Sequence, residues 1–149
     1  MLFESDQIAE PPSLEASPVK KNRDPICEEA HQLDVFKQSY RQTVLHLPAG
    51  MVLASGEQEL FNHVDPNDFM WTGHGERSVS RMIVFQNPFR STPGVSCSLS
   101  SFDCSKAQNL RYRLVVDRTG QQGFRIALHT WGDTKIARCT IRWQALGAG

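Results

Sequence analysis

The sequence predicts an all-β protein: a six-stranded antiparallel β-sandwich that follows a disordered tail and one α-helix. Two observations support this class. Apolar and polar residues alternate with a period of two through most of the second half of the chain. Short runs of this kind recur at roughly ten-residue intervals and are separated by polar turns, which is typical of a small sandwich.

The stretch from residue 109 to 143 shows the pattern most clearly. Three strand-like runs, 110–116, 124–128 and 137–145, each place apolar residues on one face and polar residues on the other. The segments 117–120 and 131–134 contain the Gly and Asp residues that tight hairpin connections require. We therefore expect a three-stranded meander with one buried face and one basic, solvent-facing face, and with Leu110 and Tyr112 on the buried side.

The N-terminal third differs from the rest of the chain in composition and in hydrophobic periodicity. Residues 1–23 are rich in Pro, Ser, Glu and Lys and lack periodicity, which predicts a disordered tail. Residues 24–47 read as an amphipathic helix that Asp24 and Pro25 open. Its apolar stripe at spacings of three and four consists of Leu33, Phe36, Tyr40 and Val44. The stripe suits packing on its own domain, pairing with a neighbouring subunit, or a remnant of a preceding domain.

The predicted sandwich occupies residues 51–149. Its first half contains a weak strand over 51–54 and clearer strands over 78–85 and 95–102. A turn at Ser55 and Gly56 ends the first strand, and residues 63–69 form a loop with a central proline.

Composition excludes several classes of function. Sixteen basic residues balance sixteen acidic ones, so nothing in the overall charge favours nucleic acid or an anionic membrane. No apolar run approaches the roughly 20 residues that span a bilayer. The N-terminus lacks the features of a secretory signal, so we expect a cytoplasmic protein or one released without a signal peptide, and an extracellular one if the sequence is a trimmed fragment. Cys97 and Cys139 fall on apolar positions and are expected to be buried thiols.

Several segments together resemble the H-type lectin domain, the family of the snail agglutinins and of the carbohydrate-binding part of the discoidins. The resemblance covers residues 52–146 and is strongest over 77–146. The segments that carry it are Ile83-Val84-Phe85, Phe89 to Val95, Phe102-Asp103, Gln108-Asn109-Leu110-Arg111, Gly123-Phe124, Thr130 to Ile136, and Thr140-Ile141-Arg142-Trp143. The family resemblance implies a six-stranded sandwich that forms trimers or hexamers and binds N-acetylgalactosamine or galactose near protomer interfaces. It also implies no metal, no cofactor and no catalysis.

The resemblance assigns sugar-binding roles to several positions. Arg111 takes the place of the arginine that holds sugar hydroxyls; a surface ion pair is the alternative. Trp131 takes the place of the tryptophan that packs on the sugar, and an anchor in the core or an interface is the alternative. Gly132 stands where some members carry a histidine, so that contact is lost or becomes one to backbone only.

Two further positions depart from the family pattern. Ala137 stands where many members have a tyrosine that walls the site. The expected acidic residue is replaced by His74, and Glu76 is the nearest carboxylate. These departures bear on the sugar specificity rather than on the fold, because none of them changes the strand pattern.

Two other functions are open from the sequence. A structural or protein-binding module would keep the sandwich but carry a degenerate sugar site, as Gly132 and Ala137 suggest. An enzyme would need chemistry from the polar segment His63, Asp65, Asp68, His74 and Glu76, which has no recognisable metal-ligand spacing. No nucleophile, P-loop or dinucleotide motif is present.

Overall fold

The computed structural model describes residues 41–62 and 68–149, which form two antiparallel sheets and one short helix. The tail predicted over 1–23 and the helix predicted over 24–47, apart from its last residues, lie outside this part of the chain. The strands are β1 (Thr43–Leu47), β2 (Met51–Asn62), β3 (Arg77–Val84), β4 (Gly94–Cys104), β5 (Tyr112–Gly120), β6 (Gly123–Thr130) and β7 (Ile136–Ala148). The helical elements are a 3₁₀ turn, Pro48–Gly50, and α2 (Phe69–Thr72), and no helix in the described ranges could cross a bilayer.

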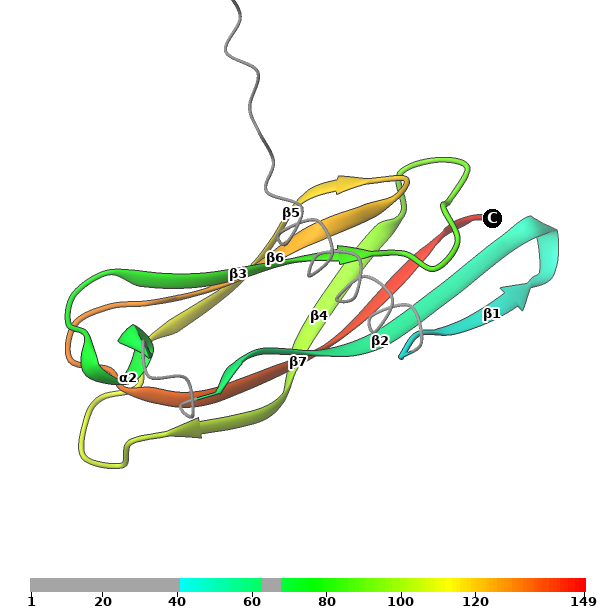
Figure 1. The fold of residues 1–149 in the computed structure, drawn as a ribbon. Helices are drawn as coiled ribbons and strands as arrows, with labels where there is room; N and C mark the ends of the chain where they lie inside the picture. Colours follow the sequence, from blue (N-terminus) through cyan, green and yellow to red (C-terminus); the bar gives the residue numbers. More distant parts are fainter. Residues whose placement is uncertain (1–40, 63–67) are drawn as a thin grey trace, which may run out of the picture.

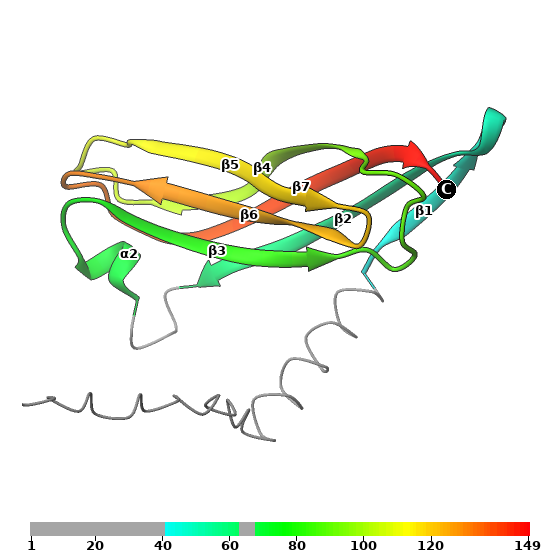
Figure 2. The ribbon, with the colours of Figure 1, turned by 90° about the horizontal axis from the view of Figure 1, so that it is seen from above.

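The two sheets pack face to face as a sandwich (Figures 1 and 2). One sheet has four strands in the order β1-β2-β7-β4, and the other has three in the order β3-β6-β5. β7 is the central partner of both β2 and β4, while β6 is central in the smaller sheet. The predicted all-β sandwich is therefore confirmed, with seven strands in place of six. The meander predicted over residues 109–143 is wrong in its third strand, because β7 crosses to the other sheet and pairs with β2 and β4 rather than with β6.

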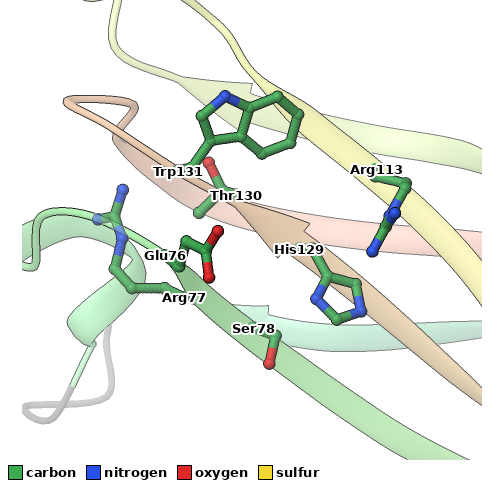
Figure 3. A pocket seen from close by; sticks show the side chains of 7 residues that line it. All are labelled: Glu76, Arg77, Ser78, Arg113, His129, Thr130 and Trp131. Carbon is green, nitrogen blue, oxygen red and sulfur yellow. The ribbon is translucent and has the colours of Figure 1, made fainter.

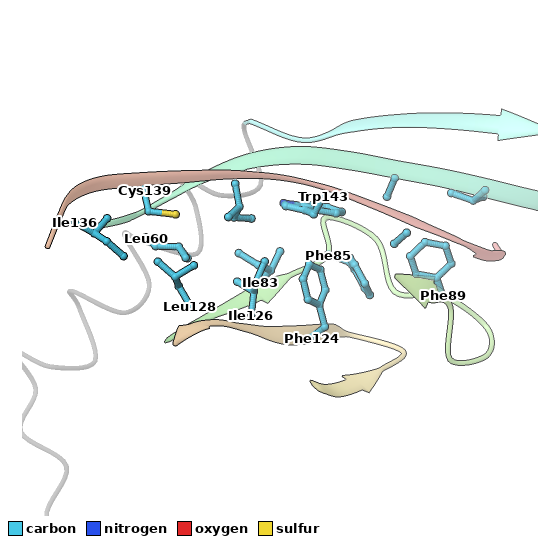
Figure 4. Close-up of a cluster of buried hydrophobic side chains, with 14 of the residues drawn as sticks. Leu60, Ile83, Phe85, Phe89, Phe124, Ile126, Leu128, Ile136, Cys139 and Trp143 are labelled. Carbon is cyan, nitrogen blue, oxygen red and sulfur yellow. The ribbon is translucent and has the colours of Figure 1, made fainter. Parts of the chain in front are cut away.

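An aromatic cluster forms the centre of the core between the sheets (Figure 4). The ring centroids of Phe85, Phe124 and Trp143 lie 5.4–5.9 Å from one another, and Phe89 meets Phe85 edge-on at 4.9 Å. Such tilted arrangements suit the quadrupoles of aromatic rings. The alternation predicted for residues 124–128 and 137–145 is confirmed, since the inward residues of β6 and β7 are all buried: Phe124, Ile126, Leu128, Cys139, Ile141, Trp143 and Ala145.

The C-terminal part of the helix predicted over 24–47 is wrong. Thr43–Leu47 is strand β1, which pairs with β2, and Pro48–Gly50 turns the chain between them. Val44 continues the three-and-four spacing of the residues before it, and for this reason its position fits a helical stripe. Its β-branched side chain instead packs against the core from the edge of the sheet.

The turn predicted at Ser55 and Gly56 is also wrong, because β2 runs through both residues to Asn62. Gly56 pairs with Trp143 on the adjacent strand, and a Cβ atom there would lie 2.8 Å from the indole ring. The glycine thus makes room for the largest core side chain rather than reversing the chain.

The buried positions predicted for Leu110 and Tyr112 are not buried in this chain. Their exposed fractions are 47% and 40%, and only Leu114 and Val116 of this run pack against the core. Tyr112 opens β5, the edge strand of its sheet, and Leu110 lies two residues before it. The Tyr112 ring contacts that of Phe102 on β4, with ring centroids 5.3 Å apart. The sandwich leaves this end of the β4–β5 edge uncovered.

The three described cysteines are free thiols. Cys139 is fully buried, and its burial raises its pKa to about 12. Cys97 is only partly buried, and burial raises its pKa as well. Both thiols therefore stay protonated near neutral pH, as buried structural cysteines do.

Candidate functional site

A cavity of about 450 Å³ lies on the outer face of the three-stranded sheet, at the end where β6 leaves it (Figure 3). Its lining residues come from the start of β3 and the residue before it, from β5, and from the end of β6 and the residue after it: Glu76, Arg77, Ser78, Arg113, His129, Thr130 and Trp131. Its volume lies within the roughly 300–1,000 Å³ of small-molecule sites. Trp131 stands at its rim with 42% of its surface exposed, so the indole is available to a ligand.

Two buried threonines fix the loop that carries Trp131. The Thr130 hydroxyl donates to the Arg111 carbonyl at 2.7 Å. The Thr134 hydroxyl donates to the Asn109 carbonyl at 2.7 Å and accepts from the Arg111 amide at 3.1 Å. Each threonine is 1% exposed. The backbone of Arg111 is therefore held between both ends of the loop, and its position relative to Trp131 is set by hydrogen bonds that exclude water.

The Arg111 side chain lies over Gly132. Its guanidinium donates to Asp133 at 2.5 Å, and this bond, with the positive charges of Arg111 and His74, lowers the pKa of the Asp133 carboxyl. Gly132 has a positive φ of 66°, and a Cβ there would lie 3.3 Å from the guanidinium. A side chain at position 132 would be strained and would press on Arg111, so the glycine permits the Arg111–Asp133 pair.

Arg77 joins the loop to the segment before β3. Its guanidinium donates to the carbonyls of Gly73 and Thr134, each at 2.6 Å, and to that of Gly75 at 3.1 Å. The backbone amide of Gly75 adds a bond to the Gly132 carbonyl at 2.9 Å. Burial lowers the pKa of Arg77. At the end of the cavity next to Trp131, this one side chain joins the segment before β3 to the loop after β6.

The short helix α2 belongs to the same assembly. Asp68 caps it by accepting from the Met70 amide at 3.0 Å, and Met70 is fully buried. Arg77 also approaches the Phe69 and Met70 carbonyls at the end of this turn, at 3.3 and 3.4 Å. The helix therefore anchors the strand that brings Glu76 to the cavity.

The structure brings most of the predicted site residues together. Arg111 and Gly132 are in contact, and Trp131 and Glu76 line the same cavity. His74 is exposed and lies close enough to Asp133 to affect its titration. Ala137 is 7% exposed and is not among the residues that line the cavity.

Sequence reasoning missed five residues of the site: Arg77, Ser78, Arg113, His129 and Thr130. Alternation places Arg113 and His129 on the outward faces of their strands, but only the register of β5 and β6 sets them opposite each other. The turn predicted at 117–120 is displaced in the structure, because β5 continues to Gly120 and the chain turns at residues 121 and 122. The position of this turn fixes which residues of β5 and β6 pair. For Arg77 no local signal exists, since its partners lie up to 57 residues away.

The described residues contain no group of three or more His, Cys, Asp or Glu side chains placed to hold a metal ion. Within the polar segment weighed for an enzyme, Asp68 serves as the cap of α2. His63 and Asp65 lie outside the described ranges.

Comparison with known proteins fits this geometry. The family model of the H-type lectin domain matches residues 80–146, which include Arg111, Trp131 and Gly132. This chain belongs to the H-type lectin domain family. The family predicted from the sequence is thereby confirmed, in the region where the resemblance was strongest. A protein of Fuscovulum blasticum described as ATP synthase subunits region ORF 7 is 36% identical over 105 residues, which cover 70% of this chain and 91% of the relative.

Solved structures agree on the fold. Wild-type discoidin II from Dictyostelium discoideum matches with a TM-score of 0.59 and 20% identity, over 68% of this chain and 38% of that one. Native recombinant discoidin II gives the same TM-score and identity over 72% of this H-type lectin chain and 40% of the other. This chain therefore spans less than half of discoidin II, and the likeness concerns the sandwich alone.

Proposed function

We propose that this H-type lectin domain binds carbohydrate, with no metal ion and no chemical conversion of the glycan. The observation that carries the proposal is the exposed Trp131 at the rim of the cavity, beside an arginine whose backbone is fixed by Thr130 and Thr134. An indole offers a flat apolar surface to sugar C–H groups, and a guanidinium donates several hydrogen bonds in fixed directions. Membership of a lectin family supports the same function and gives no support to an enzyme.

Arg111 has further N–H groups that can donate hydrogen bonds to a sugar. Its side chain is 34% exposed, and its bond to Asp133 uses one of five N–H groups. The Asp133 carboxylate supplies acceptors beside it, and Glu76 supplies others on the cavity side of Trp131. We propose terminal N-acetylgalactosamine or galactose as the sugar, on the basis of the family. Gly132 and His74 would then be bordering positions, while Ala137, which is buried and outside the cavity lining, would make no contact with the sugar.

Arg111→Ala should reduce glycan retention at least tenfold while leaving the fold intact, because the variant keeps the backbone bonds to both threonines. The measurement is binding to an array that includes terminal N-acetylgalactosamine and galactose, competed by free sugar. Arg125→Ala is the matched control. Arg125 forms the same kind of ion pair, with Asp117 at 2.5 Å, but lies within β6, away from the loop that carries Trp131.

Equal loss of glycan retention in both arginine variants would contradict a specific role for Arg111. If the folded parent protein binds no glycan on the array, the sugar-binding proposal fails. The alternative is then a protein-binding module that keeps the lectin sandwich, which the missing side chain at Gly132 and the buried Ala137 favour.

We also propose that copies of the chain associate, as a trimer, through the uncovered end of the β4–β5 edge. Leu110 and Tyr112 sit there with 47% and 40% exposure, although their sequence pattern is that of buried residues. Exposed apolar surface of this kind is typical of protein contacts. The edge adjoins Arg111, so association would place several sugar sites close together and raise avidity without new sugar contacts.

Leu110→Asp should shift the protein from oligomer to monomer in sedimentation, because it puts a charge on this edge. Leu146→Asp is the control: Leu146 is exposed to a similar extent, 45%, but lies on the outer face of the four-stranded sheet. A parent protein that sediments as a monomer would refute the association. So would a control that dissociates the oligomer while Leu110→Asp leaves it whole.

A further inference from the structure

The far end of the cavity has an unbalanced positive charge. The ion pairs within residues 41–62 and 68–149 join Arg111, Arg125, Arg138 and Arg142 to carboxylates. Arg113 is absent from these pairs although it lines the cavity. Asp117, the carboxylate on the same strand, is engaged by Arg125 through two hydrogen bonds of 2.7 and 2.5 Å.

Arg113 belongs to a row of polar side chains that crosses the sheet. Strand register places it opposite His129, and His129 opposite Ser78. The next row consists of Leu114, Leu128 and Val79, which pack in or against the core, so the polar row points outward. With strands about 4.8 Å apart, the row spans about 10 Å. Figure 3 shows these side chains on one side of the sheet, with Arg113 and His129 as neighbours.

The single carboxylate among the lining residues is Glu76, and it lies toward the Arg77 end. Arg77 is itself occupied by backbone carbonyls. The cavity therefore has two chemically different ends: an acceptor, Glu76, close to Trp131, and a group of donors, Arg113, His129 and Ser78, further along the strands.

We propose that this cavity holds an acidic group of the glycan, a sugar carboxylate or sulfate, on Arg113, with Ser78 and His129 as further donors. The inference rests on the proposed carbohydrate binding and specifies the glycan class. Trp131 would pack on the sugar ring that carries or adjoins the acidic group, and Glu76 would accept from its hydroxyls. A guanidinium is the side chain best matched to such anions, because its planar fork donates two parallel hydrogen bonds to two oxygens.

The test compares three glycans on one galactose-type core: the neutral form, a form with a carboxylate-bearing sugar, and a sulfated form. Binding to the full chain is measured by calorimetry at low and high salt. The parent should bind at least one acidic form tenfold more tightly than the neutral form, and the preference should shrink at high salt. The acidic glycan that binds more tightly than the neutral one identifies the carboxylate or the sulfate as the ligand.

Arg113→Gln should lower the affinity for the acidic form to that for the neutral form. Arg118→Gln is the control, since Arg118 lies on the same strand but outside the lining of this cavity. Unfolding curves of both variants check that the fold is kept.

The outcomes separate the two proposals. Neutral binding by the parent with no acidic preference overturns this inference and leaves carbohydrate binding standing. A preference that survives Arg113→Gln, or disappears equally in Arg118→Gln, overturns it as well. Failure of all three glycans to bind overturns the proposed function together with the inference.

Discussion

Arg77→Met should lower the free energy of unfolding by about 3–5 kcal/mol and remove glycan binding together with it. The methionine keeps most of the apolar stem but none of the donors. The carbonyls of Gly73 and Thr134 would each lose a charged donor at 2.6 Å, and hydrogen bonds to charged groups contribute about 1.5–3 kcal/mol each. The segments on either side of the cavity would then separate, so Glu76 and Trp131 would no longer face one ligand.

Urea unfolding measures the first effect and glycan calorimetry the second. Arg81→Met is the matched control on the same strand, because Arg81 donates at 3.3 Å, a longer distance, to the backbone carbonyl of Leu60. It should cost about 1 kcal/mol or less and leave binding unchanged. An Arg77→Met protein as stable as the parent would show that the carbonyls find other donors. Unchanged glycan binding in a destabilised variant would show that Arg77 does not position the site.

Trp143→Ala should destabilise the fold by about 3–5 kcal/mol, the usual cost of truncating a buried large aromatic residue. Trp143 is 2% exposed and contacts both Phe85 and Phe124. Gly56 on the adjacent strand has no side chain with which to fill the space that is left. The thermal midpoint of unfolding is the measurement.

Trp131→Ala provides the comparison, because the same substitution is made at a tryptophan that is 42% exposed. It should leave the thermal midpoint within a few degrees of the parent and abolish glycan retention. If the two tryptophan variants lost equal stability, Trp131 would be a structural anchor. If Trp143→Ala were neutral, the aromatic centre would not be the main support of the sandwich.

The sandwich was predictable because local and long-range signals agree along most of the second half of the chain. In β6 and β7 the residues with period-two apolarity are the ones that the opposing sheet buries. Signals conflicted at two places. Val44 fits a helical stripe and a strand edge equally well, and only the pairing of β1 with β2 decides between them. Gly56 reads as a turn until its partner across the sheet is known to be Trp143.

The site was predictable only in part. Arg111 and Trp131 could be placed from their resemblance to a family pattern. Arg113, His129 and Ser78 meet only through the register of three strands, and Arg77 through loops far apart in sequence. A single sequence carries little information on such pairings, because the residues concerned are ordinary surface residues on their own strands.

The division of labour in the loop from Thr130 to Thr134 has an evolutionary consequence. The hydrogen bonds that fix the loop's course come from Arg77 and the two threonines, while Trp131 and Asp133 between the threonines are exposed. Selection can therefore exchange positions 131 and 133 with little penalty to the frame around them. A domain built in this way can acquire a new ligand by substitutions between Thr130 and Thr134. The same short loop is the natural place to begin when a new binding specificity is engineered.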